Sequence, residues 1–397
     1  MRVLHVTTAF PRDHGDVITP WLVELLKRLR ADGVEAEVLT SSYKGAPDQT
    51  FDGIPVHRFR YFLRRWENLT HEETAPDRMR RSLLYRILPL FFVAAGMVAA
   101  WRLARQRRYD IVHVHWPLPM AAIGWAAARA SRAPTVTLFY GAELRFAASG
   151  PGLLRAFLRW AIRRSDQVVA ISTYTANEVR RLVERSVEVI PYTYELPEAA
   201  ARLRDDRRKG FEILTVGRLV ERKGVVHLVE ALAALSPDVD ARLVVIGDGP
   251  EAPRIRARAE ALGVSDRVDL RGRVADGALR AAYASADVFV LPAVVDARGD
   301  TEGLGVVLLE AMNFGVPVIA SAAGGIVDIV VDGETGLLVP PADASKLAAA
   351  LERIARDWSL GDRLGATGQR FVAERFAWPV IVRQWRSVYT RATTPNV

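Results

Sequence analysis

The sequence predicts an α/β protein with two domains, each built on a parallel, doubly wound sheet. Short runs rich in β-branched residues alternate with segments of helical pattern, which is the order that a parallel sheet with crossover helices requires. After Pro191 a polar stretch at 198–209 interrupts this alternation, and the pattern then begins again. The length of 397 residues, half of them hydrophobic, is sufficient for two domains with separate cores.

The predicted strands of the first half are short apolar runs at 3–7, 34–39, 111–115, 135–139, 168–171 and 187–190. Helical patterns such as 21–31 and 153–164 lie between them. A second series of strands follows, at 211–216, 242–246, 268–270, 288–291, 316–320 and 336–339. Two such domains in tandem predict a central cleft, with ligands bound beyond the carboxyl ends of the strands.

The composition narrows the class of protein. Cysteine is absent, which excludes disulfides and thiolate metal sites and favours a reducing, cytoplasmic location. We expect no targeting signal, because Met1 leads directly into a strand. Residues 1–200 carry 28 Lys and Arg against 20 Asp and Glu, which accounts for the whole net charge of +8. An anionic partner is therefore expected at the first half.

An apolar run of 15 residues, 87–101, lies within this basic region. Arginines flank it on both sides: Arg58, Arg60, Arg64, Arg65, Arg78, Arg80, Arg81 and Arg86 before it, and Arg102, Arg105, Arg107 and Arg108 after it. The run is shorter than the ~20 residues that a membrane-spanning helix needs. It predicts a core helix of the first domain, or alternatively a helix that also touches an anionic bilayer. Nucleic acid is not expected, because no zinc, helix-turn-helix or RNA-recognition signature accompanies the arginines.

The segment 300–310 carries the strongest chemical signal in the chain. It runs from a glycine-bearing loop into an apolar helix, with Glu302 before the helix and Glu310 eight positions later inside it. Backbone N–H groups at such a helix start can approach a diphosphate, and the carboxylates can accept hydrogen bonds from sugar hydroxyls. The segment therefore predicts a binding site for a sugar nucleotide.

A basic loop follows the first strand of the second half. Arg218 and Lys223 bring two cations to one loop and helix start, as a diphosphate leaving group requires. A solvated surface loop fits the same residues. Together with the segment 300–310, the loop favours phosphate binding.

Two glycine-rich loops admit more than one interpretation. The segment 247–252 matches the dinucleotide pattern G-x-G-x-x-A, but Pro250 interrupts it, and a tight turn is the better interpretation. Gly324 and Gly325 follow the strand at 316–320. They would either present backbone N–H groups to an anion or a sugar, or form a turn that needs positive φ.

Two histidines of the first half, His113 and His115, lie in the predicted strand 111–115. We expect their side chains to point to opposite faces of the strand, one packed in the core and the other facing the cleft. His115 is favoured for the cleft because it stands nearer the end of the strand. No metal site is expected, since no histidine or carboxylate partner stands at helical or turn spacing.

These motifs together resemble those of the retaining glycosyltransferases of family 4 over nearly the whole chain. The residues that carry the resemblance lie mainly in the second half: Gly217-Arg218 with Lys223-Gly224, Gly247-Asp248-Gly249, Glu302 with Glu310, Gly315-Val316-Pro317-Val318, Gly324-Gly325 and Asp332-Gly333-Glu334-Thr335-Gly336. The resemblance implies the GT-B architecture, with two Rossmann-like domains that face a central cleft. It implies an acceptor-binding domain at 1–195, a nucleotide-sugar-binding domain at 196–370 and a C-terminal helix at 371–397 that crosses back to the first domain.

Carried over to this sequence, the resemblance assigns Arg218 and Lys223 to the donor diphosphate. Glu310 would accept hydrogen bonds from the ribose hydroxyls, and Glu302 would bind the transferred sugar. Backbone N–H groups complete the implied donor site, at Gly303, Leu304 and Gly305. The resemblance also implies a front-face reaction without metal or cofactor, in which the departing phosphate helps to deprotonate the acceptor. Such a reaction needs stabilisation of the leaving group more than a protein nucleophile.

Two positions depart from the family's pattern. The loop after the first strand usually holds two adjacent glycines, and here Gly15 alone remains for contact with the donor. The strand 135–139 usually ends in His-Gly, with the histidine near the reaction centre, whereas here Tyr140 precedes Gly141. Tyrosine can donate a hydrogen bond to a phosphate or sugar but is no cation at neutral pH.

We expect Tyr140 to take the role of the missing histidine in altered form, since Gly141 and Glu143 keep the rest of the loop's pattern. The alternatives are that His115 or His14 compensates, or that activity is low. The expected acceptor-side residues are therefore His115, Tyr140 and Glu143. His115 and Tyr140 are also expected near the reacting atoms, together with Glu302.

The predicted function is transfer of a hexose from a nucleotide diphosphate sugar to a hydroxyl acceptor, either a lipid-linked saccharide or a small molecule. The chemistry fits synthesis of cell-envelope polysaccharide, glycolipid or natural-product glycosides, in the cytoplasm or peripherally at the inner face of the plasma membrane. Two other classes stay open. One is a catalytically silent sugar-nucleotide-binding protein, favoured by Tyr140, and the other is a nicotinamide-dependent oxidoreductase that uses 247–252.

Overall fold

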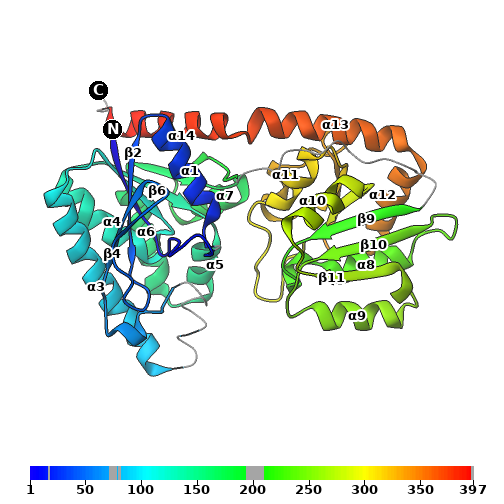
Figure 1. Ribbon diagram of the computed structural model, residues 1–397, viewed down its shortest axis with the longest axis horizontal. Coiled ribbons are helices and arrows are strands. Elements are labelled where there is room, and N and C mark those ends of the chain that lie inside the picture. The colour runs from blue at the N-terminus through cyan, green and yellow to red at the C-terminus, as the bar shows by residue number, and fades with distance from the viewer. Residues whose placement is uncertain (17, 71–77, 79–81, 194–209, 395–397) are drawn as a thin grey trace. The chain divides into compact units, whose positions relative to one another are not determined.

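The structure is a computed structural model, and it describes residues 1–16, 18–70, 78, 82–193 and 210–394 (Figure 1). The chain forms two compact units. The first consists of Met1–Glu195 together with Trp378–Val397, and the second of Leu196–Ala377. The polar stretch at 198–209 lies outside the described residues.

The first unit contains an eight-stranded sheet in the order β3-β4-β2-β1-β5-β6-β7-β8. Its strands are β1 (Arg2–Val6), β2 (Glu35–Ser41), β3 (Gln49–Phe51), β4 (Ile54–Phe59), β5 (Ile111–His115), β6 (Thr135–Phe139), β7 (Gln167–Ala170) and β8 (Glu188–Val189). Neighbouring strands run parallel except at the hairpin of β3 and β4. The parallel, doubly wound sheet is thus confirmed, with the short antiparallel hairpin as an addition at one edge.

The helices of the first unit are α1 (Pro20–Ala31), α3 (Leu83–Gln106), α4 (Pro117–Ser131), α5 (Ala142–Ser149), α6 (Gly152–Arg164), α7 (Thr173–Leu182) and α14 (Trp378–Thr393), with a short 3-10 helix, η1 (Arg64–Trp66). The main core of the unit lies under α3 and α4, where Leu4, Phe92 and Ile123 are fully or almost fully buried. A second core lies between β6, β7 and the helices α6 and α7, around Phe139 and Leu158.

The strand register places both cores on one face of the sheet, because Val114 pairs with Thr137, whose side chain shares a face with that of Phe139. Helices α1 and α14 cover the other face, where Trp21 and Trp385 pack on His115 and His113. The sheet is thus covered on both faces, as the strand and helix alternation predicts.

Helix α3 corrects the expectation for the apolar run at 87–101. The helix has 24 residues, because it begins after Ser82, whose hydroxyl accepts a hydrogen bond from the N–H of Leu84, and continues to Gln106. It buries one face, at Leu88, Phe92, Gly96, Ala100 and Ala104. A Cβ at Gly96 would overlap Ile123 of α4, so the two helices pack at close range. Within the described part of the chain, α3 is one helix that is long and apolar enough to cross a membrane by length and composition alone.

The second unit contains a six-stranded parallel sheet in the order β11-β10-β9-β12-β13-β14. Its strands are β9 (Phe211–Val216), β10 (Ala241–Ile246), β11 (Val268–Gly272), β12 (Val288–Leu291), β13 (Val318–Ser321) and β14 (Leu337–Val339). Its helices are α8 (Val225–Ala233), α9 (Ala252–Ala261), α10 (Asp276–Ser285), α11 (Val306–Asn313), α12 (Ala344–Arg356) and α13 (Trp358–Arg375), with the 3-10 helices η2 (Glu221–Lys223), η3 (Ser265–Arg267) and η4 (Gly324–Asp328).

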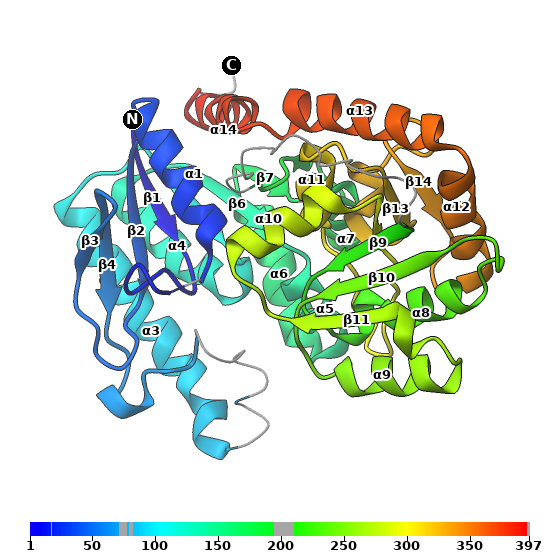
Figure 2. The same cartoon turned by 45° about the vertical axis from the view of Figure 1, so that its right-hand side comes forward.

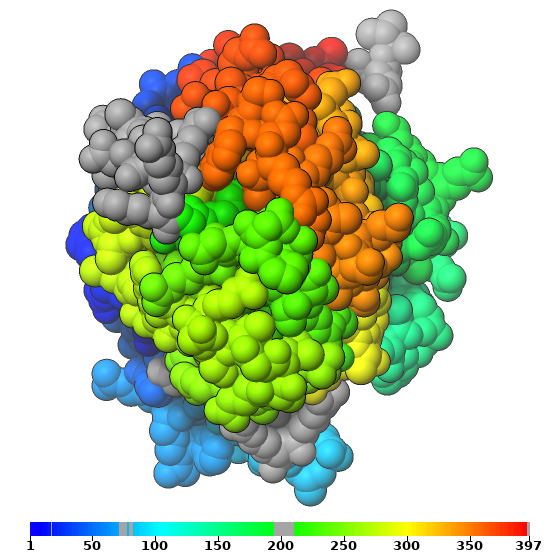
Figure 3. All heavy atoms as spheres, turned by 90° about the vertical axis from the view of Figure 1, so that its right-hand side faces the viewer, coloured from blue at the N-terminus to red at the C-terminus, as the bar shows by residue number. Residues whose placement is uncertain are grey.

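The core of the second unit lies between its sheet and the helices α8 and α12, around Leu228, Leu243 and Leu351. In the space-filling view, orange atoms of α12 and α13 and green atoms of the β9 and α8 region lie against one another on the side that faces the viewer (Figure 3). The strands β9, β12 and β13 occupy the centre of the sheet. The loops that follow these central strands hold the motifs that the sequence singles out.

The C-terminal segment contains parts of two helices, whereas the expectation was one helix at 371–397. Helix α13 ends at Arg375, and α14 begins at Trp378, so that Phe376 and Ala377 separate two helices (Figure 2). Residues 371–377 belong to the second unit, and α14 belongs to the first. Helix α14 buries Trp385 and Tyr389 against the strands of the first unit.

Candidate functional site

The second unit places Glu302 beside two cations. Lys223 and Arg222 lie in η2 after β9, and Glu302 lies in the loop before α11. The distance from Lys223 Nζ to Glu302 Oε2 is 2.6 Å, and that from Arg222 Nη1 to the same oxygen is 3.0 Å. Burial alone would raise the pKa of Glu302, but the charges of Lys223 and Arg222 outweigh it and lower this pKa. Glu302 is therefore ionised and paired at neutral pH.

Glu310 occupies the first helical turns of α11 in a different environment. Its side chain is partly buried, and Tyr283 Oη donates a hydrogen bond to Oε2. Burial raises the pKa of Glu310 to about 7. Glu310 thus has a carboxyl group that is poised to titrate near neutrality, whereas Glu302 stays charged.

Gly324 fixes the backbone of Glu302. A Cβ at Gly324 would overlap the carbonyl oxygen of Glu302, and the φ of Gly324 is 57°. Gly325 donates its backbone N–H to the same carbonyl oxygen at 2.9 Å. The N–H of Gly325 is thus engaged within the protein, which favours the turn interpretation of this loop. Gly305, with φ 90°, is the N-cap of α11 and lies between the two glutamates in the sequence.

Arg218 lies exposed in a loop that packs against the loop of residues 247–252. Leu219 donates its N–H to the carbonyl of Asp248, and Glu251 donates to the carbonyl of Leu219. A Cβ at Gly249 would overlap the backbone of Leu219. Backbone groups of the two loops are therefore paired with one another, as in a tight turn. This pairing argues against the dinucleotide interpretation, which needs free N–H groups for a pyrophosphate.

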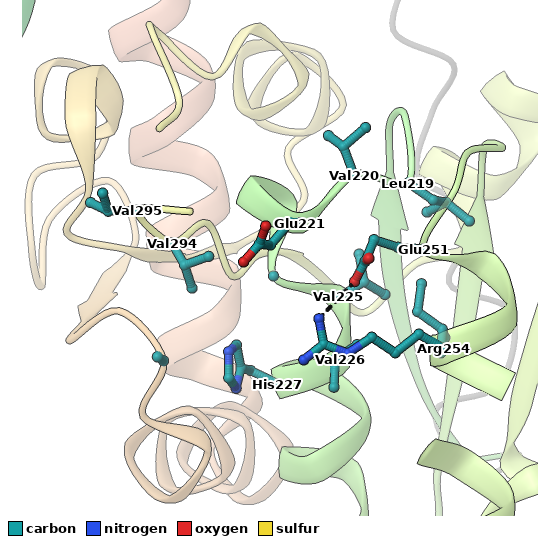
Figure 4. A pocket seen from close by; sticks show the side chains of 13 residues that line it. Leu219, Val220, Glu221, Val225, Val226, His227, Glu251, Arg254, Val294 and Val295 are labelled. Atoms are coloured by element: carbon teal, nitrogen blue, oxygen red, sulfur yellow. Dashed lines mark hydrogen bonds and ion pairs between the residues drawn. The ribbon is translucent and has the colours of Figure 1, made fainter. Parts of the chain in front are cut away.

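A cavity of about 160 Å³ lies beside η2 in the second unit (Figure 4). Its polar lining comes from Glu221, His227, Glu251 and Arg254. Arg254 pairs with Glu251 at 3.2 Å, and His227 Nδ1 lies 3.0 Å from Glu230 Oε2. The sequence did not single out His227 or Arg254, because an isolated titratable residue on a helix belongs to no motif.

In the first unit, the expectation that His113 and His115 point to opposite faces of β5 is wrong. Side chains alternate along a strand with a period of two, so residues two positions apart share a face. The rings of His113 and His115 stack, with centroids 4.1 Å apart, and both side chains are fully buried. His5 of β1 joins them, because His5 and His113 are register partners in neighbouring strands. Neither His113 nor His115 is therefore exposed toward a cleft.

The three histidines raise the question of a metal site. One ring nitrogen from each histidine lies within 4.8 Å of one nitrogen of each of the other two. The stacked rings of His113 and His115 are inclined by only 20°, whereas ligands of one ion must converge on it with their nitrogen lone pairs. Burial lowers the pKa of all three imidazoles, so the cluster is neutral. The geometry fits a metal poorly, and the expectation of no metal stays a prediction.

Tyr140 contacts the histidine cluster from the end of β6. Its hydroxyl lies 2.9 Å from His115 Nδ1, and its ring stacks on Trp116 with centroids 4.3 Å apart. Glu143, in the first turn of α5, accepts the backbone N–H of Tyr140 at 2.7 Å. Burial raises the pKa of Glu143 to about 7. Of the expected acceptor-side residues, all three are thus brought together, with His115 behind Tyr140.

The loop after β1 holds the remaining predicted residues. Gly15 donates its N–H to Asp13 Oδ1 at 2.9 Å, and Arg12 pairs with Asp16 at 2.6 Å. His14 is exposed and lies 3.7 Å from Asp52. Because His115 contacts Tyr140 directly, His115 is the histidine placed to act with it.

The chain matches two family models that together cover most of its length. Residues 20–194 match the model described as Glycosyltransferase Family 4, and residues 203–371 match that described as Glycosyl transferases group 1. The GDP-mannose-dependent alpha-(1-6)-phosphatidylinositol monomannoside mannosyltransferase of Mycobacterium tuberculosis is 32% identical over 394 residues, which cover 96% of both chains.

A second relative is the N-acetyl-alpha-D-glucosaminyl L-malate synthase of Bacillus anthracis, 28% identical over 96% of this chain and 95% of that protein. Among solved structures, sucrose-phosphate synthase from Thermosynechococcus elongatus superposes with a TM-score of 0.76 at 23% identity, covering 98% of each chain. This similarity shows the fold, and the sequence identity of the first relative over nearly its whole length shows the family. The chain belongs to the family 4 glycosyltransferases and has their GT-B fold.

Proposed function

We propose that this glycosyltransferase moves a hexose from a nucleoside diphosphate sugar to a hydroxyl acceptor with retention of configuration and without a metal ion. The observation that carries the proposal is the cluster of Lys223, Arg222 and Glu302, followed in the chain by Glu310 of α11. It combines cations for a diphosphate with carboxylates for sugar hydroxyls, all at the carboxyl ends of central strands. GDP-mannose is the donor named for the mycobacterial relative, which supports a nucleoside diphosphate sugar as the class.

The ion pairs of the cluster supply the mechanism of donor binding. Lys223 Nζ neutralises Glu302, whose Oε2 lies 2.6 Å away. A diphosphate that binds at Lys223 and the exposed Arg218 replaces the carboxylate as the partner of the cation. Glu302 is then free to accept hydrogen bonds from the hydroxyls of the sugar, while Glu310 accepts those of the ribose.

In the transfer step, the bond from the anomeric carbon to the phosphate oxygen breaks, and the acceptor oxygen forms its bond on the same face. The acceptor proton passes to the departing phosphate oxygen. Lys223 and Arg218 stabilise the negative charge that accumulates on the diphosphate. Tyr140 donates a hydrogen bond to an oxygen of the bound ligands, and Glu143 orders the Tyr140 loop through the N–H of Tyr140.

We also propose that the first unit binds the inner face of the plasma membrane through the outer face of α3. Large apolar side chains are exposed at helical spacing along that face: Leu83, Ile87, Leu90, Phe91, Val98 and Trp101. Near Trp101 a groove of about 650 Å³ is lined by Arg105, Arg129, Arg132 and Arg164. The exposed apolar side chains suit the hydrocarbon interior of a bilayer, and the arginines beside them suit its anionic headgroups. The acceptor would then be a lipid-linked saccharide, with a small molecule as the alternative.

The donor class is tested by thermal stabilisation with a panel of UDP-, GDP-, ADP- and TDP-sugars, because a ligand that binds only the native state raises its apparent stability. With the donor so identified, Glu310→Ala and Arg218→Ala should each lower kcat/KM for the donor by about tenfold or more. Glu260→Ala and Arg256→Ala, at exposed positions of α9, are the matched controls. Full activity in both site variants would contradict the proposed donor site.

The membrane contact is tested by sedimentation with vesicles of phosphatidylglycerol and phosphatidylcholine at low and high salt. Binding should require the anionic lipid, fall with salt, and fall again in the double variant Arg105→Glu, Arg132→Glu. The double variant Arg256→Glu, Arg280→Glu makes the same change of charge in the second unit and should bind normally. Arg80 and Arg81, the arginines before α3 that the sequence also favours, lie outside the described residues. Equal sedimentation with neutral and anionic vesicles would refute the contact.

A further inference from the structure

A row of hydrogen bonds connects Tyr140 with two buried histidines of the first unit. Tyr140 Oη lies 2.9 Å from His115 Nδ1, and His115 Nε2 lies 3.1 Å from His5 Nδ1. Both histidines are fully buried. The row ends at His5 Nε2, which has no hydrogen-bond partner among the residues that the structure describes. Three side chains from β1, β5 and the end of β6 thus share two hydrogen bonds in an interior that excludes water.

The protons of this row can be arranged in two ways. In the first, Tyr140 donates to His115 Nδ1, His115 donates from Nε2 to His5, and the unpaired atom of His5 carries a hydrogen. In the second, His5 donates from Nδ1 to His115, His115 donates to the oxygen of Tyr140, and the Tyr140 hydroxyl keeps its own hydrogen for another partner. A neutral imidazole carries one hydrogen and one lone pair, so the direction of each bond fixes that of the next.

The two arrangements differ in which buried donor is left without a partner. In the first arrangement the unpaired donor is Nε2–H of His5, and in the second it is the Tyr140 hydroxyl. A buried donor without an acceptor is costly, whereas an acceptor without a donor costs less. When a ligand oxygen accepts from Tyr140, the second arrangement therefore leaves only the acceptor Nε2 of His5 unpaired.

We propose that His5 and His115 are positioning residues that make Tyr140 a hydrogen-bond donor to the bound ligands when a ligand oxygen is present. The inference rests on the proposed function only for the statement that Tyr140 contacts a ligand. His5 belongs to neither the glutamate motif nor the arginine motif. In this proposal it affects the reaction through its hydrogen bond to His115.

The neutral state of the rings supports the row. Burial lowers the pKa of His5 to about 3 and that of His115 well below its usual value. A doubly protonated His115 would donate from both nitrogens and would oblige Tyr140 and His5 both to accept. Near neutral pH the row is therefore neutral, and its direction is a matter of tautomers alone.

The same cluster contains a third buried histidine, His113, that is hydrogen-bonded to a tyrosine but lies outside the row. His113 Nδ1 lies 2.8 Å from the hydroxyl of Tyr389 in α14, and His113 is as fully buried as His5. The ring of His113 stacks on His115, but its hydrogen bond leads to Tyr389 and away from Tyr140. His113 is therefore the control for the effects of removing a buried imidazole from this cluster.

The kinetic test compares His5→Phe with His5→Asn, alone and combined with Tyr140→Phe, with the donor found in the panel screen. Phenylalanine removes the hydrogen bond to His115, whereas the asparagine amide can replace that of Nδ1. His5→Phe should lower kcat by about tenfold with little change in KM for the donor, and His5→Asn should restore most of it. In the Tyr140→Phe background, His5→Phe should cost nothing further, because the hydroxyl that the row directs is gone.

His113→Phe should instead lower kcat by the same factor with and without Tyr140→Phe. A loss in His5→Phe that persists unchanged in the Tyr140→Phe background would overturn the proposal, since it would show a packing effect of the imidazole.

A second test needs no substrate and remains decisive if His5→Phe does not fold. In protein labelled with ¹⁵N-histidine, Tyr140→Phe should shift the imidazole nitrogen resonances of both His115 and His5 and leave those of His113 in place. An unchanged His5 resonance would refute the row even if donor binding is found. Conversely, a failed donor screen with shifted His5 resonances would contradict the proposed function and leave the row established.

Discussion

The two units hold their candidate site residues in opposite electrostatic states. In the second unit, Glu302 is ionised and lies between Lys223 and Arg222. In the first unit, Tyr140 and His115 are neutral, because burial lowers the pKa of His115 and raises that of Tyr140. The difference matches the ligands that we propose: a diphosphate carries charge that cations must neutralise, and a hydroxyl acceptor carries none. Charge is thus concentrated where we propose that the leaving group binds.

The largest effect should come from the charged side of this comparison. Lys223→Met should lower kcat by about 100-fold or more, because the leaving diphosphate loses a preorganised cation. Tyr140→Phe removes one neutral hydrogen bond and should cost only about tenfold. Steady-state kinetics measure both, with Lys346→Met on the exposed face of α12 as the control. Equal losses of kcat in the two variants would contradict the distinction between a charged donor side and a neutral acceptor side.

The next effect concerns the backbone that carries Glu302. Gly324→Ala should lower the free energy of unfolding by about 1–3 kcal/mol and reduce donor affinity, because its Cβ overlaps the carbonyl of Glu302. Gly333→Ala is a matched control, since Gly333 also has positive φ, 74°, but a Cβ there meets no atom within 4 Å. Chemical denaturation and calorimetric titration measure the two quantities. Equal destabilisation by both variants would show that the loss of stability comes from the positive φ alone and not from the overlap with Glu302.

A smaller effect should appear in the pH dependence of stability. Glu310 and Glu143 each have a pKa raised to about 7, so the folded chain keeps protons that the unfolded chain releases above its pKa of about 4.3. The unfolded state then binds fewer protons, and stability falls as pH rises from about 4.5 to about 7, by about 1–3 kcal/mol for each group. Above pH 7 the loss is complete.

Urea denaturation at pH 5, 6, 7 and 8 measures this decline. Glu310→Gln should remove the contribution of the second unit to the decline in stability. Glu143→Gln should remove the contribution of the first unit. Glu260→Gln, exposed on α9, should leave the profile unchanged. A profile that does not respond to either site variant would show that both carboxyl groups titrate normally.

The smallest effect is expected from metal removal. Transfer should be within about twofold of its starting rate after dialysis against EDTA, because Lys223 and Arg218 supply the positive charge that the diphosphate needs. Loss of activity that Mg²⁺ or Mn²⁺ restores would show that the cationic side chains are insufficient.

Much of the fold was predictable because buried parallel strands are nearly continuous apolar runs. The predicted strands at 111–115 and 135–139 agree with β5 and β6 residue for residue. The hairpin of β3 and β4 was missed, since β3 is the three-residue segment Gln49–Phe51, which is too short to show an alternation. Helix α3 was underestimated in length, because Arg86 and Arg102 interrupt the apolar run without ending the helix.

The candidate site was predictable where its residues are close in sequence. Glu302 and Glu310 stand on one loop and helix, so their spacing alone indicated a shared role. His5 belongs to the cluster only because β1 and β5 are neighbours, and no local pattern shows which strands pair. The contact of Tyr140 with His115 likewise depends on the pairing of β5 with β6. Sequence spacing thus reveals motifs within a segment and misses clusters assembled across a sheet.

The division of the chain between the units has a consequence for its synthesis. The first unit needs α14, whose Trp385 and Tyr389 pack against its strands and cover His113. A ribosome synthesises α14 only after every residue of the second unit. Leu196–Ala377 can therefore complete its own fold first, although its residues are made later than most of the first unit. Until α14 emerges, a chaperone would find the apolar strands around His113 uncovered.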